Sequence, residues 1–419
     1  MRKMIDSGVE WLGDIPETWD LVQLGSLFSE HKNKNLGLQS TNLLSLSYGN
    51  IIRKDINTSD GLLPESFEGY NVIDDGDIVL RLTDLQNDQR SLRVGLSHER
   101  GIVTSAYVTL RKRNPAMNSQ FFYYLIHSYD VRKGFYGMGA GVRQGLNFAG
   151  VRKIMLTLPS ADEQKAIADF LGKKIAQVDT LIANVHAQIE KLKAYKQSVI
   201  TEIVTKGLDP SVPMKDSGVE WIGDIPMQWS TIRVKQLLKE RKERSVDGSE
   251  EPLSMSQKLG LVPTRMLDMI PNMASSFVGA KLTYVDDLVF NKLKAHLGVF
   301  SVSKYDGLVS PDYAVYYSTG KVHLKYLEYL FKTPQCISEF RKRSTGIAAG
   351  LTRLYTDGLF AIECPFPEMD EQISIVEYLN GKCAQIDRLI AIKQAKIEKL
   401  EQYKKSLIYE YVTGKREVV

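Results

Sequence analysis

The chain of 419 residues has few of the side chains that bind metals or form disulfides. Its three cysteines, Cys336, Cys364 and Cys383, include no CxxC pair, and its six histidines show no HExxH or other paired spacing. Zinc sites and disulfide frameworks need such groups at short, regular spacing. We therefore expect neither, and we expect a reducing compartment, the cytoplasm.

Long apolar runs are also missing. No window approaches about 18 consecutive apolar residues, so we expect no membrane span. The N-terminal sequence MRKMIDSGVEW has no apolar stretch of the kind found in signal peptides. Hydrophobic residues make up 43% of the chain and charged residues 25%, which is ordinary for globular proteins, and the length allows two or three domains.

Catalytic motifs are absent as well. The sequence has neither a GxxxxGK[ST] phosphate-binding loop nor a GxSxG nucleophile turn. The glycine-rich stretch 137–141 does not follow the GxGxxG pattern, and a similar stretch at 346–350 favours a recognition or hinge loop common to both places. Asn114-Pro115-Ala116 lacks the aromatic residue of an adenine-flipping NPPY motif. We therefore expect a protein that binds and does not catalyse; an enzyme with an unrecognised motif remains the alternative.

What the chain does contain is a duplication. Residues 7–16 read SGVEWLGDIP and residues 217–226 read SGVEWIGDIP, and a tryptophan follows each phrase at the same offset of about 210. We call these two stretches the opening phrases. A second set of matches, led by Asp162-Glu163-Gln164 and Asp370-Glu371-Gln372, recurs at an offset of about 208. Solenoid repeats have periods of roughly 20–50 residues, so this period indicates a duplicated domain.

A long helix is expected at the C-terminal end of each copy. Apolar residues recur at alternating spacings of four and three from Leu171 to Ile203 and from Leu379 to Tyr411, broken only by Lys196 in the first series and by Lys393 and Lys404 in the second. This heptad pattern predicts helices over 160–206 and 368–413 that pair antiparallel as a coiled coil. The alternative is that each stripe packs on its own globular domain. Ser160 is the expected N-cap, with Glu163 completing a capping box.

The segments between the repeated parts differ between copies. Strand-like runs at 77–82, 106–110, 287–291 and 313–317 are followed by helix-like stretches at 119–129 and 324–332, which indicates a mixed α/β fold. Residues 77–79 and 101–107 align with 287–289 and 307–313, so the two segments share one fold while most of their surface residues differ. This pattern suits two readers of different ligands on one scaffold.

The variable segments are mildly basic, with 16 Lys and Arg against 13 Asp and Glu in residues 20–158 and 19 against 14 in residues 230–366. Basic and amide side chains can read base edges or contact phosphates of DNA, and the runs 111–113 and 341–343 suit phosphates best. The two aligned tyrosines, Tyr107 and Tyr313, complete the candidate set. The candidates are Arg81, Tyr107, Arg111, Lys112, Arg113, Arg143, Gln144, Lys292, Lys294, His296, Tyr313, Arg341, Lys342, Arg343 and Arg353.

The duplicated opening phrase, a variable domain after each copy and a long helix led by Asp-Glu-Gln together resemble the specificity subunit of type I restriction-modification systems. The resemblance covers essentially the whole chain. It implies a mixed α/β fold in which two similar target-recognition domains are joined by two long helices in an antiparallel coiled coil, an internal pseudo-twofold duplication. The corresponding segments are a first recognition domain at 1–159, a central helix at 160–206, a linker with the second opening phrase at 207–229, a second recognition domain at 230–367 and a distal helix at 368–419.

The resemblance also implies a function. Each recognition domain would read one half of a bipartite, asymmetric site in double-stranded DNA. The helices would space the domains and dock two modification (methyltransferase) subunits, which restriction subunits with translocase and nuclease activity can join. S-adenosylmethionine, Mg²⁺ and ATP would then belong to the partner subunits and none to this chain. A coiled-coil scaffold with no nucleic-acid role is a further alternative.

Overall fold

The computed structural model describes residues 2–57, 64, 66–85, 88, 90–138, 145–256, 259–267, 276–346 and 352–418. The chain divides into two compact units. The first contains Met1–His186 and Gln394–Val419, and the second contains Ala187–Lys393. Each unit therefore holds one variable segment, one opening phrase and part of both long helices.

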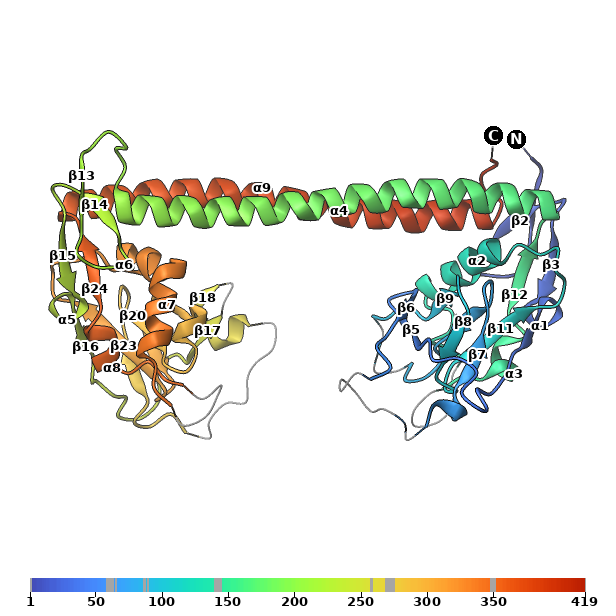
Figure 1. Ribbon diagram of the computed structural model, residues 1–419, viewed down its shortest axis with the longest axis horizontal. Coiled ribbons are helices and arrows are strands. Elements are labelled where there is room, and N and C mark those ends of the chain that lie inside the picture. The colour runs from blue at the N-terminus through green and yellow to red at the C-terminus, as the bar shows by residue number, and fades with distance from the viewer. Residues whose placement is uncertain are drawn as a thin grey trace. The chain divides into compact units, whose positions relative to one another are not determined.

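The two units have the same sheet topology. In the first, a four-stranded antiparallel sheet has the order β4-β11-β8-β9, and in the second the order β16-β23-β20-β21. Two-stranded sheets surround it in each unit (Figure 1). The duplication found in the sequence is thus a duplication of fold.

The elements of the first unit, in chain order, have these bounds. They are β1 Met4–Asp6, β2 Asp14–Pro16, β3 Asp20–Gln23, α1 Leu24–Leu27, β4 Phe28–Glu30, β5 Leu44–Ser47, β6 Asn50–Arg53, η1 Phe67–Gly69, β7 Asn71–Ile73, β8 Ile78–Leu80, β9 Val94–Leu96, β10 Gly101–Val103, β11 Val108–Lys112, α2 Ser119–Val131, α3 Phe148–Val151, β12 Met155–Leu158 and the start of α4, Ala161–Lys206.

The second unit continues the series. Its elements are β13 Met214–Asp216, β14 Asp224–Pro226, β15 Ser230–Arg233, α5 Val234–Leu237, β16 Leu238–Glu240, β17 Leu253–Ser256, β18 Gly260–Pro263, η2 Thr264–Met266, β19 Lys281–Thr283, β20 Leu288–Asn291, η3 Ala295–Leu297, β21 Phe300–Val302, β22 Gly307–Val309, β23 Tyr313–Ser318, α6 Leu324–Phe331, α7 Pro334–Arg343, α8 Thr356–Phe360, β24 Glu363–Phe366 and α9, Met369–Val412.

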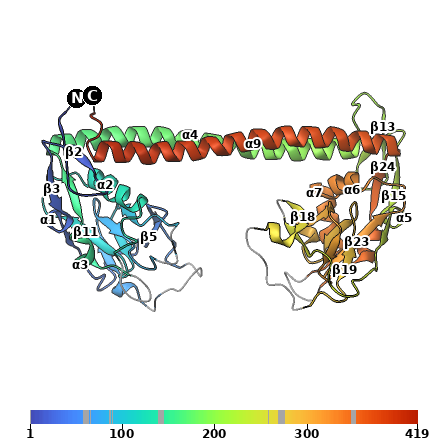
Figure 2. The same ribbon diagram turned by 180° about the vertical axis from the view of Figure 1, so that it is seen from behind.

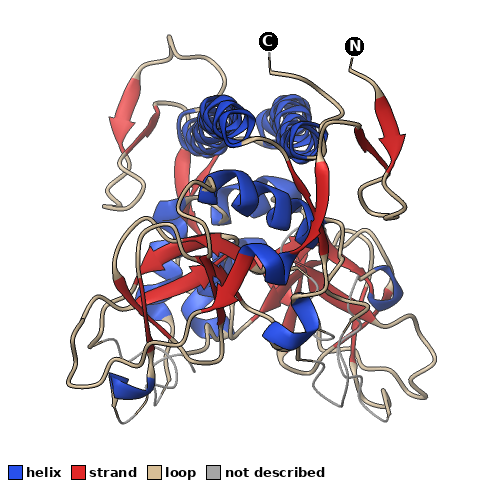
Figure 3. Cartoon of the chain, turned by 90° about the vertical axis from the view of Figure 1, so that its right-hand side faces the viewer, coloured by secondary structure: helices blue, strands red, loops and turns tan. Residues whose placement is uncertain are grey.

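Both long helices are confirmed, and they pair antiparallel within each unit (Figure 2). In the first unit the rings of Phe170 and Tyr411 pack in a tilted arrangement with centroids 4.6 Å apart, and the Lys404 ammonium lies 2.7 Å from an Asp179 carboxylate oxygen. Seen from the end of this unit, the helices are two adjacent coils (Figure 3). In the second unit Lys196 pairs with Asp387 at 2.6 Å. Two of the three lysines that interrupt the apolar series therefore form ion pairs across the seam, and the third, Lys393, donates a hydrogen bond to the side chain of Gln188.

The ends of the helices also belong to the globular cores. Leu171, Leu407 and Tyr411 pack into the core of the first unit with Phe121 of α2, and α2 lies beside the helices in Figure 1. In the second unit the ends of the helices pack into the globular core in the same way, for example through Val204 of α4. The two packing arrangements that the sequence left open are thus both present, at different positions along the same helices.

The expected capping box is only half formed. Ser160 Oγ accepts a hydrogen bond from the Glu163 backbone N–H at 3.3 Å, as expected. The Glu163 carboxylate does not return to the cap; it accepts a hydrogen bond from Trp19 Nε1 at 2.8 Å and pairs with Arg2 at 2.7 Å. In the second unit Glu371 binds Trp229 Nε1 at the same distance. The repeated Glu and the repeated Trp therefore tie each opening phrase to its helix.

The repeated glutamine next to this glutamate connects the helix to the recognition domain. Gln164 accepts a hydrogen bond from the backbone N–H of Asn118, the N-cap of α2, and donates to the Pro159 carbonyl. Gln372 does the same with His323, the N-cap of α6, and with Pro367. The repeated Glu and Gln thus connect each long helix to its opening phrase and to its recognition domain, which explains why they recur between otherwise different segments.

Two of the expected strands have other bounds in the structure. The strand expected at 77–82 is β8, which is shorter because Asp77 lies in a turn and its carboxylate accepts the Asp74 N–H. The strand expected at 106–110 is β11, which starts two residues later because Tyr107 N–H closes a turn onto the Thr104 carbonyl. The segment 207–229, expected as a linker with the second opening phrase, contains strand β13, which pairs with β14 of that phrase.

Candidate nucleic-acid and partner interfaces

One end of each four-stranded sheet gathers several candidate residues. In the first unit Leu80 pairs with Val108, so Arg81, just after β8, and Tyr107, just before β11, lie at the same sheet end. In the second unit Asn291 pairs with Tyr313, so Lys292, just after β20, lies beside the start of β23. Strand pairing thus brings together residues that are more than 20 positions apart in sequence.

The chain returns to this end after the glycine-rich stretch. Leu146 N–H donates to the Leu82 carbonyl at 2.9 Å, and Leu354 N–H donates to the Lys292 carbonyl at 3.0 Å. Arg353 therefore joins Lys292 and Tyr313 in the second unit, where its guanidinium lies 3.5 Å from Asp312. Arg143 and Gln144, the corresponding candidates of the first unit, lie outside the described residues. We call this region of each unit the loop end of the sheet.

Arg93 organises the loop end of the first unit and was not anticipated from the sequence. Its side chain is fully buried and donates hydrogen bonds to the carbonyls of Thr83, Asp84 and Asp88. A buried guanidinium satisfies several carbonyls at once, so it can hold an irregular loop in one conformation. The signal in the sequence is weak, because Arg93 directly precedes a short apolar strand and looks like any surface arginine.

The same loop holds Arg81 next to an ionised carboxylate. Hydrogen bonds from Ser91 lower the pKa of Asp88 to about 2, so Asp88 is charged at neutral pH. An Arg81 Nη atom lies 3.8 Å from it, and the Arg81 side chain is about one third exposed. A weak ion pair therefore orients Arg81, and the remaining N–H groups of its guanidinium can donate hydrogen bonds to a ligand.

The basic run at 111–113 lies at the other end of β11. Lys112 donates to the carbonyls of Pro115 and Met117, and Arg113 donates to those of Gly25 and Phe28. Arg111 pairs with the buried Asp77 and with Asp74, and these hydrogen bonds raise its pKa. All three side chains bind their own protein, so contact with DNA phosphates at this run stays a prediction.

The candidates of the second unit outside the loop end lie on two elements that pack together, η3 and α7. Lys294 and His296 flank Ala295 at η3, while Arg341, Lys342 and Arg343 end α7. Lys342 and Arg343 pair with Glu339 at 2.7 and 3.6 Å. Among the described residues, none pairs with the exposed Arg341, which is therefore the best placed of this run to meet a phosphate.

One group in the first unit resembles a metal site. His31, Asp74 and Asp77 bring one ligand atom each within 4.8 Å of one another. The guanidinium of Arg111 already pairs with both carboxylates, so a cation of the protein itself neutralises them. The group thus serves the sheet as an ion-pair cluster.

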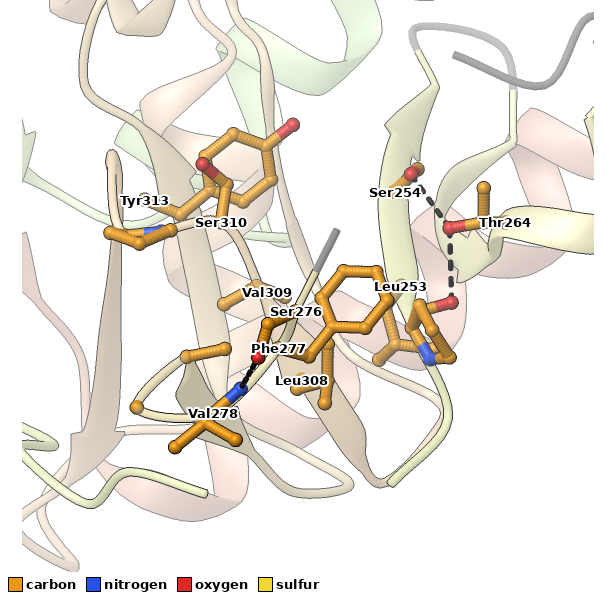
Figure 4. Close-up of a pocket in the computed structure, with 14 residues that line it drawn as sticks. Leu253, Ser254, Thr264, Ser276, Phe277, Val278, Leu308, Val309, Ser310 and Tyr313 are labelled. Carbon is orange, nitrogen blue, oxygen red and sulfur yellow. Dashed lines mark hydrogen bonds between the residues drawn. The ribbon is translucent and has the colours of Figure 1, made fainter. Parts of the chain in front are cut away.

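A cavity of about 390 Å³ lies beside the loop end of the second unit (Figure 4). Tyr313 and Ser310 lie on one side of it and Ser254 and Thr264 on the other, with Phe277 between them. Burial raises the pKa of Tyr313, so its hydroxyl is protonated and can donate a hydrogen bond. Apolar walls with a few hydroxyls can accept a methyl group or an aromatic ring together with one polar edge.

The paired helices present a second kind of surface. Helical geometry, at about 100° per residue, places Leu181 and Tyr403 on the face of the first unit's helix pair that points away from its recognition domain. Tyr195 and Leu389 occupy the equivalent places in the second unit, since both pairs are related by the offset of 208. All four side chains are 48–50% exposed. The duplication thus gives the two units equivalent exposed apolar surfaces on their helices.

Comparisons with known proteins agree with this architecture. Residues 16–191 match the family described as type I restriction modification DNA specificity domain. The chain is 23% identical, over 96% of its length, to the type I restriction enzyme MjaVIII specificity subunit of Methanocaldococcus jannaschii, covering 93% of that protein. It is equally similar to the putative MjaX specificity subunit of the same organism, of which it covers 95%.

Among solved structures, a chain from work on complex assembly and conformational transition of the type I R-M system matches with a TM-score of 0.68. The match covers 95% of this chain and 98% of that one at 13% identity, so it supports the fold. Within the described residues, no helix is both long and apolar enough to cross a membrane. Over nearly its whole length the chain is therefore similar to specificity subunits of type I restriction-modification systems, and residues 16–191 match the DNA specificity domain of that family.

Proposed function

We propose that this chain recognises DNA for a type I restriction-modification complex, with each recognition domain reading one half of a bipartite, asymmetric site. The observation that carries the proposal is the pair of loop ends. One fold places Arg81 and Tyr107 at the loop end of the first unit and Lys292, Tyr313 and Arg353 at the loop end of the second. The same scaffold with different donors reads different bases, because arginine and lysine favour guanine edges and methyl-sized pockets favour thymine.

The chain acts without chemistry of its own in this proposal. Its three cysteines are buried, and burial raises their pKa, so they are poor nucleophiles. Methyl transfer with S-adenosylmethionine, and restriction with Mg²⁺ and ATP, belong to partner subunits. The cytoplasm, where the DNA and the partners are present, is the proposed location.

Two modification subunits are the proposed partners. The exposed apolar pairs on the helices, Leu181 with Tyr403 and Tyr195 with Leu389, occur once in each unit. Two equivalent surfaces suit two copies of one partner, and restriction subunits can join this assembly. The single-chain enzyme is disfavoured by the absence of a catalytic motif in the sequence.

Sequencing of methylated bases in a host strain, with and without this gene and with the partner subunits present, tests the proposal. We expect a methyladenine motif of two unlike half-sites with an unspecified gap, and we expect it to vanish on deletion of the gene. If the partners are expressed and active but no motif depends on the gene, the proposal is wrong. Methylation by the purified chain alone would instead support the enzyme.

The helices supply a sharper form of this test. Deleting residues 182–188 from α4 together with the equivalent 390–396 from α9 shortens each helix by one heptad. The deletion keeps Asp179 opposite Lys404 and Lys196 opposite Asp387. At about 1.5 Å per residue and 3.4 Å per base pair, the gap should shorten by about three base pairs while the half-sites stay the same. An unchanged gap would show that the helices do not set it.

A further inference from the structure

The outward faces of the two helix pairs are not equally apolar. In the first unit this face exposes Leu181 and Tyr403. In the second unit it exposes Tyr195 and Leu389 and, on the same side of α9, also Ile392 and Tyr378. Ile392 is 59% exposed, more than any other apolar side chain on either long helix. The second unit therefore offers twice as many exposed apolar side chains on this face.

The duplication shows which residues cause the difference. Ile392 corresponds to Asn184 at the offset of 208, so one copy has an aliphatic side chain where the other has an amide. Tyr378 corresponds to Phe170, which is covered by Tyr411 at a centroid distance of 4.6 Å. The common residues are exposed to the same extent in both units, so these two positions carry the asymmetry.

Tyr378, Leu389 and Ile392 share one side of α9 within the second unit, because their spacings of 11 and 3 residues are close to whole numbers of helical turns. Three exposed apolar side chains within 15 residues on one side of an otherwise charged helix form an apolar stripe, a larger apolar surface than the single exposed apolar residues that any surface carries. Nothing in the described part of the chain covers it. A partner is needed to bury the stripe.

We infer that the two docking positions for modification subunits are unequal, and that the position on the second unit is filled first. This inference rests on the proposed function. The occupant is a partner present in two copies, because the common residues of the surface recur in both units and each copy would meet the same pair of one leucine and one tyrosine. Its contact surface is apolar with an acidic rim, since Lys382 and Arg388 flank the stripe and the Lys382 ammonium lies 5.8 Å from the Tyr195 ring centre.

A titration of the full chain with purified modification subunits, followed by native mass spectrometry, tests the inference. The wild-type chain should pass through a well-populated complex with one modification subunit. Ile392→Asn, which copies the residue of the first unit, should weaken the first binding step about tenfold, as expected for the loss of one buried aliphatic side chain. The reciprocal change Asn184→Ile should strengthen the second step by about the same factor and leave the first unchanged.

Cross-linking identifies the occupied position. Gln177 and Gln385 are exposed equivalents on the same outward faces, and a photo-reactive amino acid placed at either reports on its own unit. With less than one modification subunit per chain, the cross-link should form mainly from position 385. Equal cross-linking from both positions, together with unchanged binding by the Ile392→Asn variant, would overturn the inference while leaving the proposed function intact.

Two other outcomes are distinct. No binding of modification subunits by the wild-type chain would contradict the proposed function itself. If the chain alone forms dimers that Ile392→Asn dissolves, the stripe serves a second copy of this chain, and the inference is wrong. Circular dichroism of both variants is the control for folding, and because both residues are exposed we expect spectra like the wild type.

Discussion

The two recognition domains bury the same aspartate but neutralise it from different strands. Asp77 and Asp287 are 3% and 2% exposed, and each accepts a hydrogen bond from the backbone N–H three residues before it. In the first unit the guanidinium comes from Arg111 on β11, with Nε at 2.8 Å. In the second it comes from Arg241, which follows β16, with two bonds of 2.7 and 3.0 Å.

Backbone pairing shows that the two arginines are not equivalent residues. His31 N–H binds the Thr109 carbonyl as Arg241 N–H binds that of Val315, so His31 holds the place of Arg241. Arg111 holds the place of Tyr317, whose ring lies 4.9 Å from the Arg241 guanidinium. The fold thus requires one guanidinium at the aspartate, and either neighbouring strand can provide it. The strand that does not supply the guanidinium can change its side chains without loss of the sheet.

Converting one arrangement into the other should have the largest effect. Arg111→Tyr leaves Asp77 buried and without its guanidinium, and we expect a loss of about 2–3 kcal/mol in the free energy of unfolding. This is less than the roughly 3–5 kcal/mol for a fully buried pair, because Arg111 is about one third exposed. The second substitution His31→Arg, which restores the arrangement of the second unit, should recover at least half of the loss. Chemical denaturation measures both.

The His31→Arg variant alone is the control, since it adds a second guanidinium where one suffices and should gain little. If the double variant is no more stable than Arg111→Tyr, the two positions are not interchangeable. Each recognition domain would then need its guanidinium at one particular position.

The response to acid should also differ between the units. Burial, and then the charges of Lys404 and Lys405, lower the pKa of His127 on α2 to about 4. The neutral form is favoured in the fold, so its contribution to stability is full above about pH 6.5 and is lost as the pH falls toward 4. His127→Gln should therefore reduce the acid destabilisation of the first unit by about 2 kcal/mol at pH 4.5. In the second unit the equivalent residue is Lys332, the C-cap of α6.

Asp130 on the same helix has the opposite dependence of stability on pH. Burial raises its pKa to about 6, so the protonated form is favoured in the fold, and its contribution to stability is lost as the pH rises through 6. Hydrogen exchange measured at pH 4.5 and 7 separates the amides of the two units. An unchanged acid response of the first unit in the His127→Gln variant would show that another group governs it.

The ties between the opening phrases and the helices should give the smallest effect. Glu371→Ala removes the acceptor of Trp229 Nε1, and we expect a loss of about 1 kcal/mol in the free energy of unfolding. Glu163→Ala should cost more, because Glu163 also pairs with Arg2. Thermal denaturation of the two variants, with the Glu→Gln variants as controls that keep an acceptor, measures the difference. Equal losses would mean that the ion pair with Arg2 contributes nothing.

Periodic features were predictable from the sequence, and contacts between distant segments were not. The heptad pattern predicted both long helices within a residue or two, because a 3.6-residue period leaves a continuous trace in the sequence. The repeated Glu163 was assigned to a capping box, since its partner Trp19 is 144 residues away and no local pattern joins them. Arg93 looked like a surface residue for the same reason. The loop-end candidates depend on strand register, which a sequence of short strands does not specify.

The ion pairs across the helix seam have a consequence for the origin of the chain. Asp179 and Asp387 are equivalent residues, and so are Lys196 and Lys404, yet each aspartate pairs with the lysine of the other copy. A single copy therefore already carries both charges at positions where a second identical copy, running in the opposite direction, would meet them. An ancestral gene encoding one copy would have specified a symmetric dimer. Fusion of two such copies in one chain would leave each half free to diverge, because the charges that pair the helices are present in both copies.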